Sequence, residues 1–127
     1  MGYMVHHAII VTGSDYKDAV TKAHAIAEGV FGESVTPIVA SINGYRSFMV
    51  APDGSKEGWD ESAAGDLRRR EFVDYLKKQR HGDLSSPLDW VVVQYGDDNG
   101  DTRIVDDSDA VGRRDELRGI MKHWPEP

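Results

Sequence analysis

The chain has 127 residues, a formal net charge of −7 and no cysteine, and its 39% hydrophobic and 29% charged residues are typical of one globular domain. The acidic balance argues against nucleic acid as a partner, and the lack of cysteine excludes disulfides, thiol nucleophiles and Cys-based zinc sites. No apolar stretch is long enough to span a bilayer and the N-terminus lacks a secretory pattern, so we expect a cytoplasmic protein with no membrane partner.

The first predicted element is a short apolar run from Ala8 to Val11. A continuous run of this kind predicts a strand that is buried on both faces and therefore central in a sheet. A polar break follows, where Ser14 or Asp15 can cap the next helix. Apolar residues then recur every three or four positions up to Phe31, which predicts a helix that ends at Gly32.

Asn43-Gly44 lies between two alternating apolar runs, Val35 to Ile42 and Tyr45 to Val50. A type I′ turn requires positive φ at both central residues, and Asn-Gly adopts that conformation at the lowest steric cost. The pattern therefore predicts a β-hairpin in the middle of the chain. Since Pro37 has no N–H to donate, the first strand of the hairpin is expected at a sheet edge, or Pro37 at its start.

A second helix is predicted from a cap at Asp60 or Ser62 to about Gly82. Its apolar face is expected to comprise Ala64, Leu67, Phe72, Tyr75 and Leu76. The segment from Trp90 to Tyr95 is rich in valine and aromatic residues and predicts a strand. A short returning strand is expected from Thr102 to Val105.

A single domain is expected at 1–109, followed by a loosely held polar tail at 110–127. Within the tail, the segment from Arg113 to His123 has few apolar positions, namely Leu117, Ile120 and Met121. It therefore predicts a marginal helix.

The order strand, helix, hairpin, helix, strand is the βαββαβ pattern of a ferredoxin-like α+β sandwich, here with an extra C-terminal β-strand. Two helices then lie on one face of an antiparallel sheet, and right-handed crossovers place the first strand centrally. No further helix is predicted to cover the other face. That face is expected to be solvated or to pack on a partner, and an apolar face of useful size would favour a homodimer.

Motifs for catalysis, metals or cofactors are not found in this sequence. His6 and His7 are adjacent on a predicted strand and so point to opposite faces, and no two histidines have the i, i+4 spacing of a helical metal pair. The run from Asp97 to Asp101 resembles a calcium loop but lacks the acidic residue at its first position. Tyr45 and Phe48 point to opposite faces, unlike the stacking aromatics of RNA-binding domains. We therefore predict no catalytic residue, metal, cofactor or nucleic acid partner.

Binding residues are predicted from residue type and position. Tyr45, Arg46 and Trp59 are candidates because Tyr, Trp and Arg are enriched where protein partners bind most tightly. Trp90 is a fourth candidate, since Trp90 and Tyr95 are five residues apart on one strand and at least one must look away from the helices. In the alternative interpretation, Trp59 simply packs across the start of the second helix.

Charge is unevenly placed along the chain. Six Lys or Arg lie between 68 and 81, on the predicted second helix, and six Asp lie between 97 and 109. Two solvated surfaces are the ordinary interpretation of such runs. The acidic run also allows a functional one, in which it imitates nucleic acid.

Three segments of the chain have distinctive sequences. They read Asn43-Gly44-Tyr45-Arg46-Ser47-Phe48, Ala51-Pro52-Asp53-Gly54-Ser55-Lys56-Glu57-Gly58-Trp59 and Ser86-Pro87-Leu88-Asp89-Trp90-Val91. Through them the chain, over about Val5 to Asp109, resembles small uncharacterised proteins encoded by phages of actinobacteria. The resemblance implies an intracellular protein made during infection, with no established activity and no site residues to carry over. By analogy with small phage proteins, it also suggests that the target is a host protein or a signalling molecule.

The leading hypothesis is a non-enzymatic binding protein, directed at a host protein in the host cytoplasm through the exposed sheet face or the region from Tyr45 to Trp59. One alternative is an acidic mimic of nucleic acid that blocks a host enzyme. Another is a nucleotide-binding sponge or small enzyme. In that case Arg46 and Arg68 to Arg70 would meet the phosphates, and Tyr45 or Trp59 would stack on the base.

Overall fold

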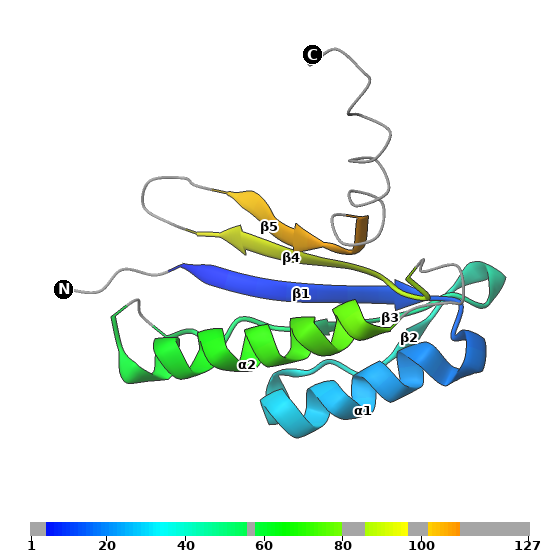
Figure 1. The fold of residues 1–127 in the computed structure, drawn as a ribbon, viewed down its shortest axis with the longest axis horizontal. Coiled ribbons are helices and arrows are strands. Elements are labelled where there is room, and N and C mark those ends of the chain that lie inside the picture. Colours follow the sequence, from blue (N-terminus) through cyan, green and yellow to red (C-terminus); the bar gives the residue numbers. More distant parts are fainter. Residues whose placement is uncertain (1–4, 56–57, 80–85, 97–101, 110–127) are drawn as a thin grey trace, which may run out of the picture.

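The computed structural model describes residues 5–55, 58–79, 86–96 and 102–109. It shows an α+β fold with a five-stranded sheet in the order β2-β3-β1-β4-β5, every neighbouring pair antiparallel. Two helices pack on one face of that sheet (Figure 1). The strands are β1 (His6–Gly13), β2 (Val39–Ala40), β3 (Arg46–Val50), β4 (Asp89–Tyr95) and β5 (Arg103–Asp107), and the helices are α1 (Ala19–Phe31) and α2 (Asp60–Lys78).

β1 is the central strand, as its apolar run predicts, and it pairs with both β3 and β4. Ile9 and Val11 are fully buried in the core beneath the helices. Ile10, between them, is 40% exposed, so the prediction that this strand is buried on both faces is wrong. The reason is geometric: successive side chains of a strand alternate between faces, and α1 and α2 lie on the same face.

The Asn43-Gly44 turn forms as predicted, with φ of 64° at Asn43 and 73° at Gly44. The strand before it is much shorter than predicted, since β2 comprises two residues, and it lies at the sheet edge as expected. Pro37 cannot donate to β3. On the N-terminal side of Pro37 the chain meets β3 again at Thr36, whose N–H donates to the Met49 carbonyl at 2.9 Å.

α1 ends where its sequence predicts, but its N-cap is Asp18 rather than Ser14 or Asp15. Asp15 still contacts its first turn. The Asp15 carboxylate accepts the Thr21 N–H at 3.0 Å and the Thr21 hydroxyl at 2.9 Å, so this side chain satisfies a free N–H group of the first turn. At the other end the helix ends at Gly32, with φ of 64°. That conformation strains residues with a Cβ, which explains a glycine there.

α2 begins at Asp60, but its N-cap is Trp59 rather than Asp60 or Ser62 as predicted. The Trp59 carbonyl accepts the Ser62 N–H at 3.1 Å. Leu67, predicted on the apolar face, is 62% exposed, which corrects that assignment. It lies five residues before the fully buried Phe72 and therefore about 140° round the helix from it.

The core fills the space between the two helices and the covered face of the sheet. Phe72 of α2 is at its centre, with its ring centroid 5.7 Å from that of Phe31 and 6.4 Å from that of Phe48. The buried cluster contains Ile9, Val11, Val20, Ala23, Ala27, Phe48, Val50, Phe72, Val73, Leu76, Leu88, Trp90 and Val92.

The two C-terminal strands are confirmed as β4 and β5, and β5 extends to Asp107, beyond the predicted end at Val105. The acidic turn at 97–101, the predicted end of the second helix at Gly82 and the tail at 110–127 all lie outside the described residues.

Candidate functional site

The open face of the sheet, on the side away from the helices, has an apolar centre. The register of the strands places Met49, Ile10 and Val91 side by side in one row. The next row pairs Val93 with Ile104. Directly opposed residues in an antiparallel sheet have Cβ atoms about 5 Å apart, so these rows are continuous. We call Ile10, Met49, Val91, Val93 and Ile104 the open-face patch.

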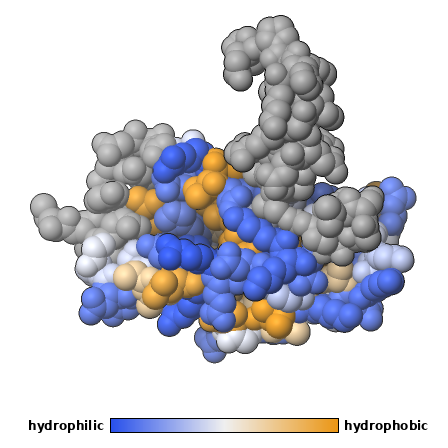
Figure 2. Space-filling model, in the orientation of Figure 1, coloured by the Kyte–Doolittle hydropathy of each residue, from blue (hydrophilic) through white to orange (hydrophobic). Residues whose placement is uncertain are grey.

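The open-face patch is accessible in this chain. Ile104 is 62% exposed and Ile10 is 40% exposed, and the other three members are half-buried. Figure 2 looks along the helix and sheet layers rather than onto the open face, and on the side in view it shows apolar side chains lying between hydrophilic ones. Contiguous apolar residues on an otherwise polar surface are typical of a site that another molecule covers.

A hollow of about 400 Å³ adjoins the patch and gives it shape. Ile10, Val91 and Ile104 line its apolar part, and Asp89 and Asp107 bring carboxylates to it. The site therefore combines an apolar floor with an acidic margin, which suits an occupant that is apolar on one side and basic beside it.

The structure does not bring the predicted binding residues Tyr45, Arg46 and Trp59 together. Arg46 is paired with Gly13 at one end of the sheet, and β3 runs from there to Val50 near the other end, before the chain reaches Trp59. Figure 1 shows the β2–β3 hairpin and the N-terminal end of α2 at opposite ends of the molecule. Tyr45 is 43% exposed and Trp59 is 49% exposed, so each is accessible, but they belong to two separate surfaces.

Trp90 is a core residue in this structure, contrary to its selection as a surface contact. It is 3% exposed and belongs to the buried cluster. Its indole Nε1 is buried and has no hydrogen-bond partner among the described residues. Tyr95 lies on the open side, 39% exposed, with its ring centroid 5.3 Å from that of His6. The five-residue spacing thus predicted the opposite orientations correctly, but Tyr95 is the exposed member.

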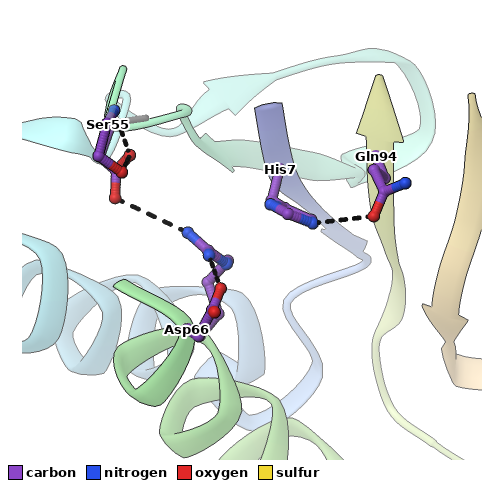
Figure 3. A network of polar contacts seen from close by, with 6 residues as sticks. His7, Ser55, Asp66 and Gln94 are labelled. Carbon is purple, nitrogen blue, oxygen red and sulfur yellow. Dashed lines mark hydrogen bonds and ion pairs between the residues drawn. The ribbon is translucent and has the colours of Figure 1, made fainter. Parts of the chain in front are cut away.

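A polar cluster lies on the covered side of the sheet, where the loop after β3 meets α2 (Figure 3). The Arg69 side chain is 14% exposed; its Nη1 lies 3.8 Å from Asp53 Oδ2, and its Nη2 pairs with Asp66 Oδ1. Asp53 Oδ1 accepts the Ser55 N–H at 2.9 Å and the Ser55 hydroxyl at 2.7 Å. We call Asp53, Ser55, Asp66 and Arg69 the Arg69 cluster, and it ties the loop to the helix.

Gly65 makes room for the Arg69 cluster, because a Cβ at that position would lie 2.5 Å from Asp53 Oδ2. Partial burial by itself would raise the pKa of Asp53. The hydrogen bonds from Ser55 and the charges of Arg69 and Arg68 outweigh that effect and lower the pKa below its ordinary value. Asp53 therefore remains ionised to a lower pH than a free aspartate.

His7 lies beside this cluster, on the covered side of β1. Its Nε2 is 3.2 Å from Oε1 of Gln94 on the neighbouring β4, and Figure 3 shows the two side chains directed toward each other. An amide oxygen accepts but cannot donate, so this arrangement places a proton on Nε2. His7 and Arg69 also line two hollows, one of about 70 Å³ that Arg68 and Ser34 share and one of about 500 Å³ along α2 and β5.

The two charge runs meet in the structure. Lys77 Nζ of the basic helix lies 2.9 Å from Asp106 Oδ2 of the acidic segment, and both side chains are partly exposed. At this position the runs neutralise each other rather than forming two separate solvated surfaces. The pair also joins α2 to β5 across the 500 Å³ hollow that both residues line.

Sequence reasoning predicted an uncovered sheet face but did not identify the residues of the open-face patch, and it missed the Arg69 cluster. A signal for each was present in the sequence. Alternation along β1 places Ile10 opposite Ile9 once the helices are assigned to one face. Gly65 was the signal for the cluster, because glycine inside a helix costs about 1 kcal/mol relative to alanine and so indicates a close approach. The long-range pairing of Asp53 with Arg69 had no signal in the local pattern.

Among the described residues, no group of three or more His, Asp or Glu side chains is placed to hold a metal ion. Within the same ranges no helix has the length and apolar character needed to cross a membrane. Comparisons of the chain with protein-family models, with curated proteins and with solved structures found no match. The geometry of the patch and of the cluster is therefore the basis for a functional proposal.

Proposed function

We propose that this protein is a non-enzymatic binding protein that contacts a protein partner through the open-face patch. The observation that carries the proposal is the exposure of Ile10 and Ile104, 40% and 62%, on a sheet face that neither α1 nor α2 covers. Burial of apolar surface contributes about 25 cal/mol per Å², so covering this face would favour association.

The fold is proposed to be ferredoxin-like. The element order βαββαβ and the strand order β2-β3-β1-β4 support this topology, and β5 adds one strand beside β4. In that arrangement both helices lie on one face, which leaves the other available for binding.

The partner is proposed to be a host protein in the bacterial cytoplasm, and the chain to be phage-encoded. The support is the likeness of segments 43–48, 51–59 and 86–91 to phage proteins of actinobacteria. A homodimer through the same face is the competing arrangement, since a self-complementary apolar patch suits a two-fold axis.

The test is capture from an actinobacterial lysate by the immobilised full chain, at low and at moderate salt, with two matched variants. Ile104→Glu places a charge in the open-face patch, and Leu67→Glu places the same charge on α2 at a residue that is also 62% exposed. We expect one dominant host protein at both salts, lost with Ile104→Glu and retained with Leu67→Glu. Equal capture by both variants would show that the open-face patch is not the binding surface. Self-association without capture of a host protein would show that the partner is a second copy of the chain.

A small anionic ligand such as a nucleotide is a second candidate, favoured by the hollows that His7 and Arg69 line beside Arg68. Arg68 and Arg69 offer N–H donors and positive charge, although Asp53 and Asp66 already neutralise part of that charge. Arg46 is not part of this site, because it lies at the far end of β3 and 3.8 Å from Asp15 Oδ2. A panel of nucleotides that gives no thermal shift of the purified chain would dispose of this candidate.

The acidic mimic has less support. Asp106 is engaged by Lys77 at 2.9 Å, and residues 97–101 lie outside the described ranges. Binding of this kind weakens steeply with added salt, so the two salt conditions of the capture experiment also test it.

A further inference from the structure

The covered side of the sheet has its own hollow, at the margin where β5 extends beyond the helices. A helix is about 10 Å across with its side chains and neighbouring strands are about 4.8 Å apart, so each helix covers about two strands. β5 is the fifth strand and lies beyond β4 at the sheet edge (Figure 1). The hollow of about 500 Å³ lies between this margin and α2. Its volume is within the range of small-molecule sites, about 300–1,000 Å³.

An irregularity of the sheet forms one wall of this hollow. The register of β4 with β5 shifts between Val92 and Val93. On β5 the shift leaves Val105 without an opposite residue, so that Val105 and Asp106 both oppose Val92. All three of these residues line the hollow. Bulges redirect side chains and are over-represented next to active sites, so this one is an independent indication that the hollow is a functional site.

The floor of the hollow is apolar and only partly covered. Val73 of α2 and Val92 of β4 are nearly buried, whereas Val105 is 50% exposed. A ligand with an apolar body would remove the rest of the Val105 surface from water. Such burial contributes about 25 cal/mol per Å².

The charges on the walls of the hollow balance, with three basic and three acidic side chains besides His7. Two of the basic ones are already engaged within the protein, since Arg69 pairs with Asp66 and Lys77 Nζ lies 2.9 Å from Asp106 Oδ2. A balanced site favours a ligand that carries both signs of charge over one with a net charge.

The remaining two charges, Arg70 and Asp74, are exposed and have no ion pair or hydrogen bond among the described residues. They are four residues apart on α2, so their Cβ atoms are about 5–6 Å apart on one side of the helix. A pair of this kind on a helix surface contributes only about 0.3–0.5 kcal/mol, so the two charges remain available to a ligand that brings a partner for each.

We propose that this hollow binds a free α-amino acid with an aliphatic side chain. Arg70 holds the α-carboxylate, because a guanidinium presents two parallel N–H donors to a carboxylate. Asp74 accepts the N–H groups of the α-ammonium, and the side chain lies on the valine floor. Both charges of the ligand are attached to one carbon atom, so a single molecule reaches two residues one helical turn apart. The site is separate from the open-face patch and does not depend on the function proposed for it.

Calorimetric titration of the full chain with leucine tests the proposal. Three analogues each remove one part of the ligand: leucinamide lacks the carboxylate, N-acetyl-leucine lacks the ammonium, and glycine lacks the apolar side chain. We expect leucine to bind at least tenfold more tightly than each analogue, since each leaves one feature of the site without a partner. Valine and phenylalanine extend the series of side chains, and adenosine monophosphate serves as an anionic ligand.

Four variants on α2 locate the site. Arg70→Gln and Asp74→Asn each remove one proposed contact, and Lys78→Gln and Glu71→Gln remove the same charges from exposed positions that do not line the hollow. The first two should bind leucine at least tenfold more weakly than the parent, and the controls should stay within about twofold of it. Arg70→Gln should also lose the preference for leucine over leucinamide, and Asp74→Asn the preference over N-acetyl-leucine.

Several results would overturn the site. Absence of binding by leucine, valine and phenylalanine at millimolar concentration would exclude an aliphatic or aromatic amino acid. Equal affinity for leucinamide or N-acetyl-leucine would show that both charges are not recognised, and tighter binding of adenosine monophosphate would identify an anion site instead. Equal effects of the paired variants and their controls would place binding elsewhere. Ile104→Glu should bind leucine as the parent does, so failure of this site and failure of the protein-binding patch are observed separately.

Discussion

The two faces of the sheet are built from the same strands, yet their side chains have opposite environments. Ile9 and Ile10 show the contrast best, because they are adjacent and identical in type but 0% and 40% exposed. The first packs beneath α1 and α2, and the second lies between Met49 and Val91 on the open face. One apolar run of β1 therefore supplies both the core and the proposed binding surface. The role of each residue depends on which face of the sheet its side chain points to, not on its hydrophobicity.

The largest expected effect tests this contrast directly. Ile9→Ala removes fully buried methyl groups and should lower the free energy of unfolding by about 2–5 kcal/mol. Ile10→Ala, on the accessible face, should cost about 1 kcal/mol, since part of its surface is already hydrated. Urea unfolding of both variants measures the difference. Equal losses would mean that the open face is covered in solution, and dependence of the Ile10→Ala loss on protein concentration would identify the cover as a second copy.

The Arg69 cluster allows a second comparison, between a largely buried and an exposed charge on one helix. Arg69→Leu leaves Asp53 and Asp66 without their shared cation and should destabilise the fold by about 1–2 kcal/mol, less than for a fully buried pair because Asp53 is partly exposed. Arg70→Leu, at the exposed neighbouring position, should change stability by less than about 0.5 kcal/mol. Thermal or urea unfolding compares them. Similar small changes at both positions would show that the cluster adds little to stability.

A smaller effect, visible in pH dependence, is expected at Gly65. The folded-state pKa of Asp53 is below its unfolded value, so its ionisation contributes stability above about pH 4 that is lost as pH falls through the folded pKa. Gly65→Ala introduces a Cβ 2.5 Å from Asp53 Oδ2 and should displace that carboxylate from Arg69. The variant gains helix propensity, about 1 kcal/mol, so its stability at neutral pH should change little. Its loss of stability on acidification below about pH 4 should become shallower. An unchanged acid profile would show that Asp53 keeps its contacts in the variant.

These comparisons also show what the sequence could predict. Local signals determined the elements well: the Asn43-Gly44 turn, the helix end at Gly32 and the strand at Trp90 to Tyr95 depend on backbone preferences and short-range patterns. The α+β class followed from their order. The short β2 was missed because the loss of pairing beside Pro37 depends on how the edge meets β3.

The candidate site was harder to predict, because it depends on contacts between distant residues. The exposure of Ile10 depends on which face the helices cover, and the position of Ile104 depends on its pairing with Val93. By contrast, the prediction of binding residues from residue type and position chose Trp90, which is buried in the core. Composition alone does not distinguish a tryptophan that binds a partner from one that fills the core.

The smallest expected effect on stability is at Tyr45, Arg46 and Trp59. These surface residues were predicted to bind a partner because their residue types are enriched at binding sites. Tyr45→Ala with Arg46→Ala alters the hairpin end, and Trp59→Ala alters the start of α2, at the opposite end of the sheet. All three side chains are well exposed, so each variant should remain within about 0.5 kcal/mol of the parent. If the open-face patch is the binding surface, neither variant should lose the partner that Ile104→Glu loses, when capture is measured on folded proteins. Loss of capture in one of them alone would move the site to that end of the molecule. Loss in both would require a partner large enough to contact both ends of the sheet at once.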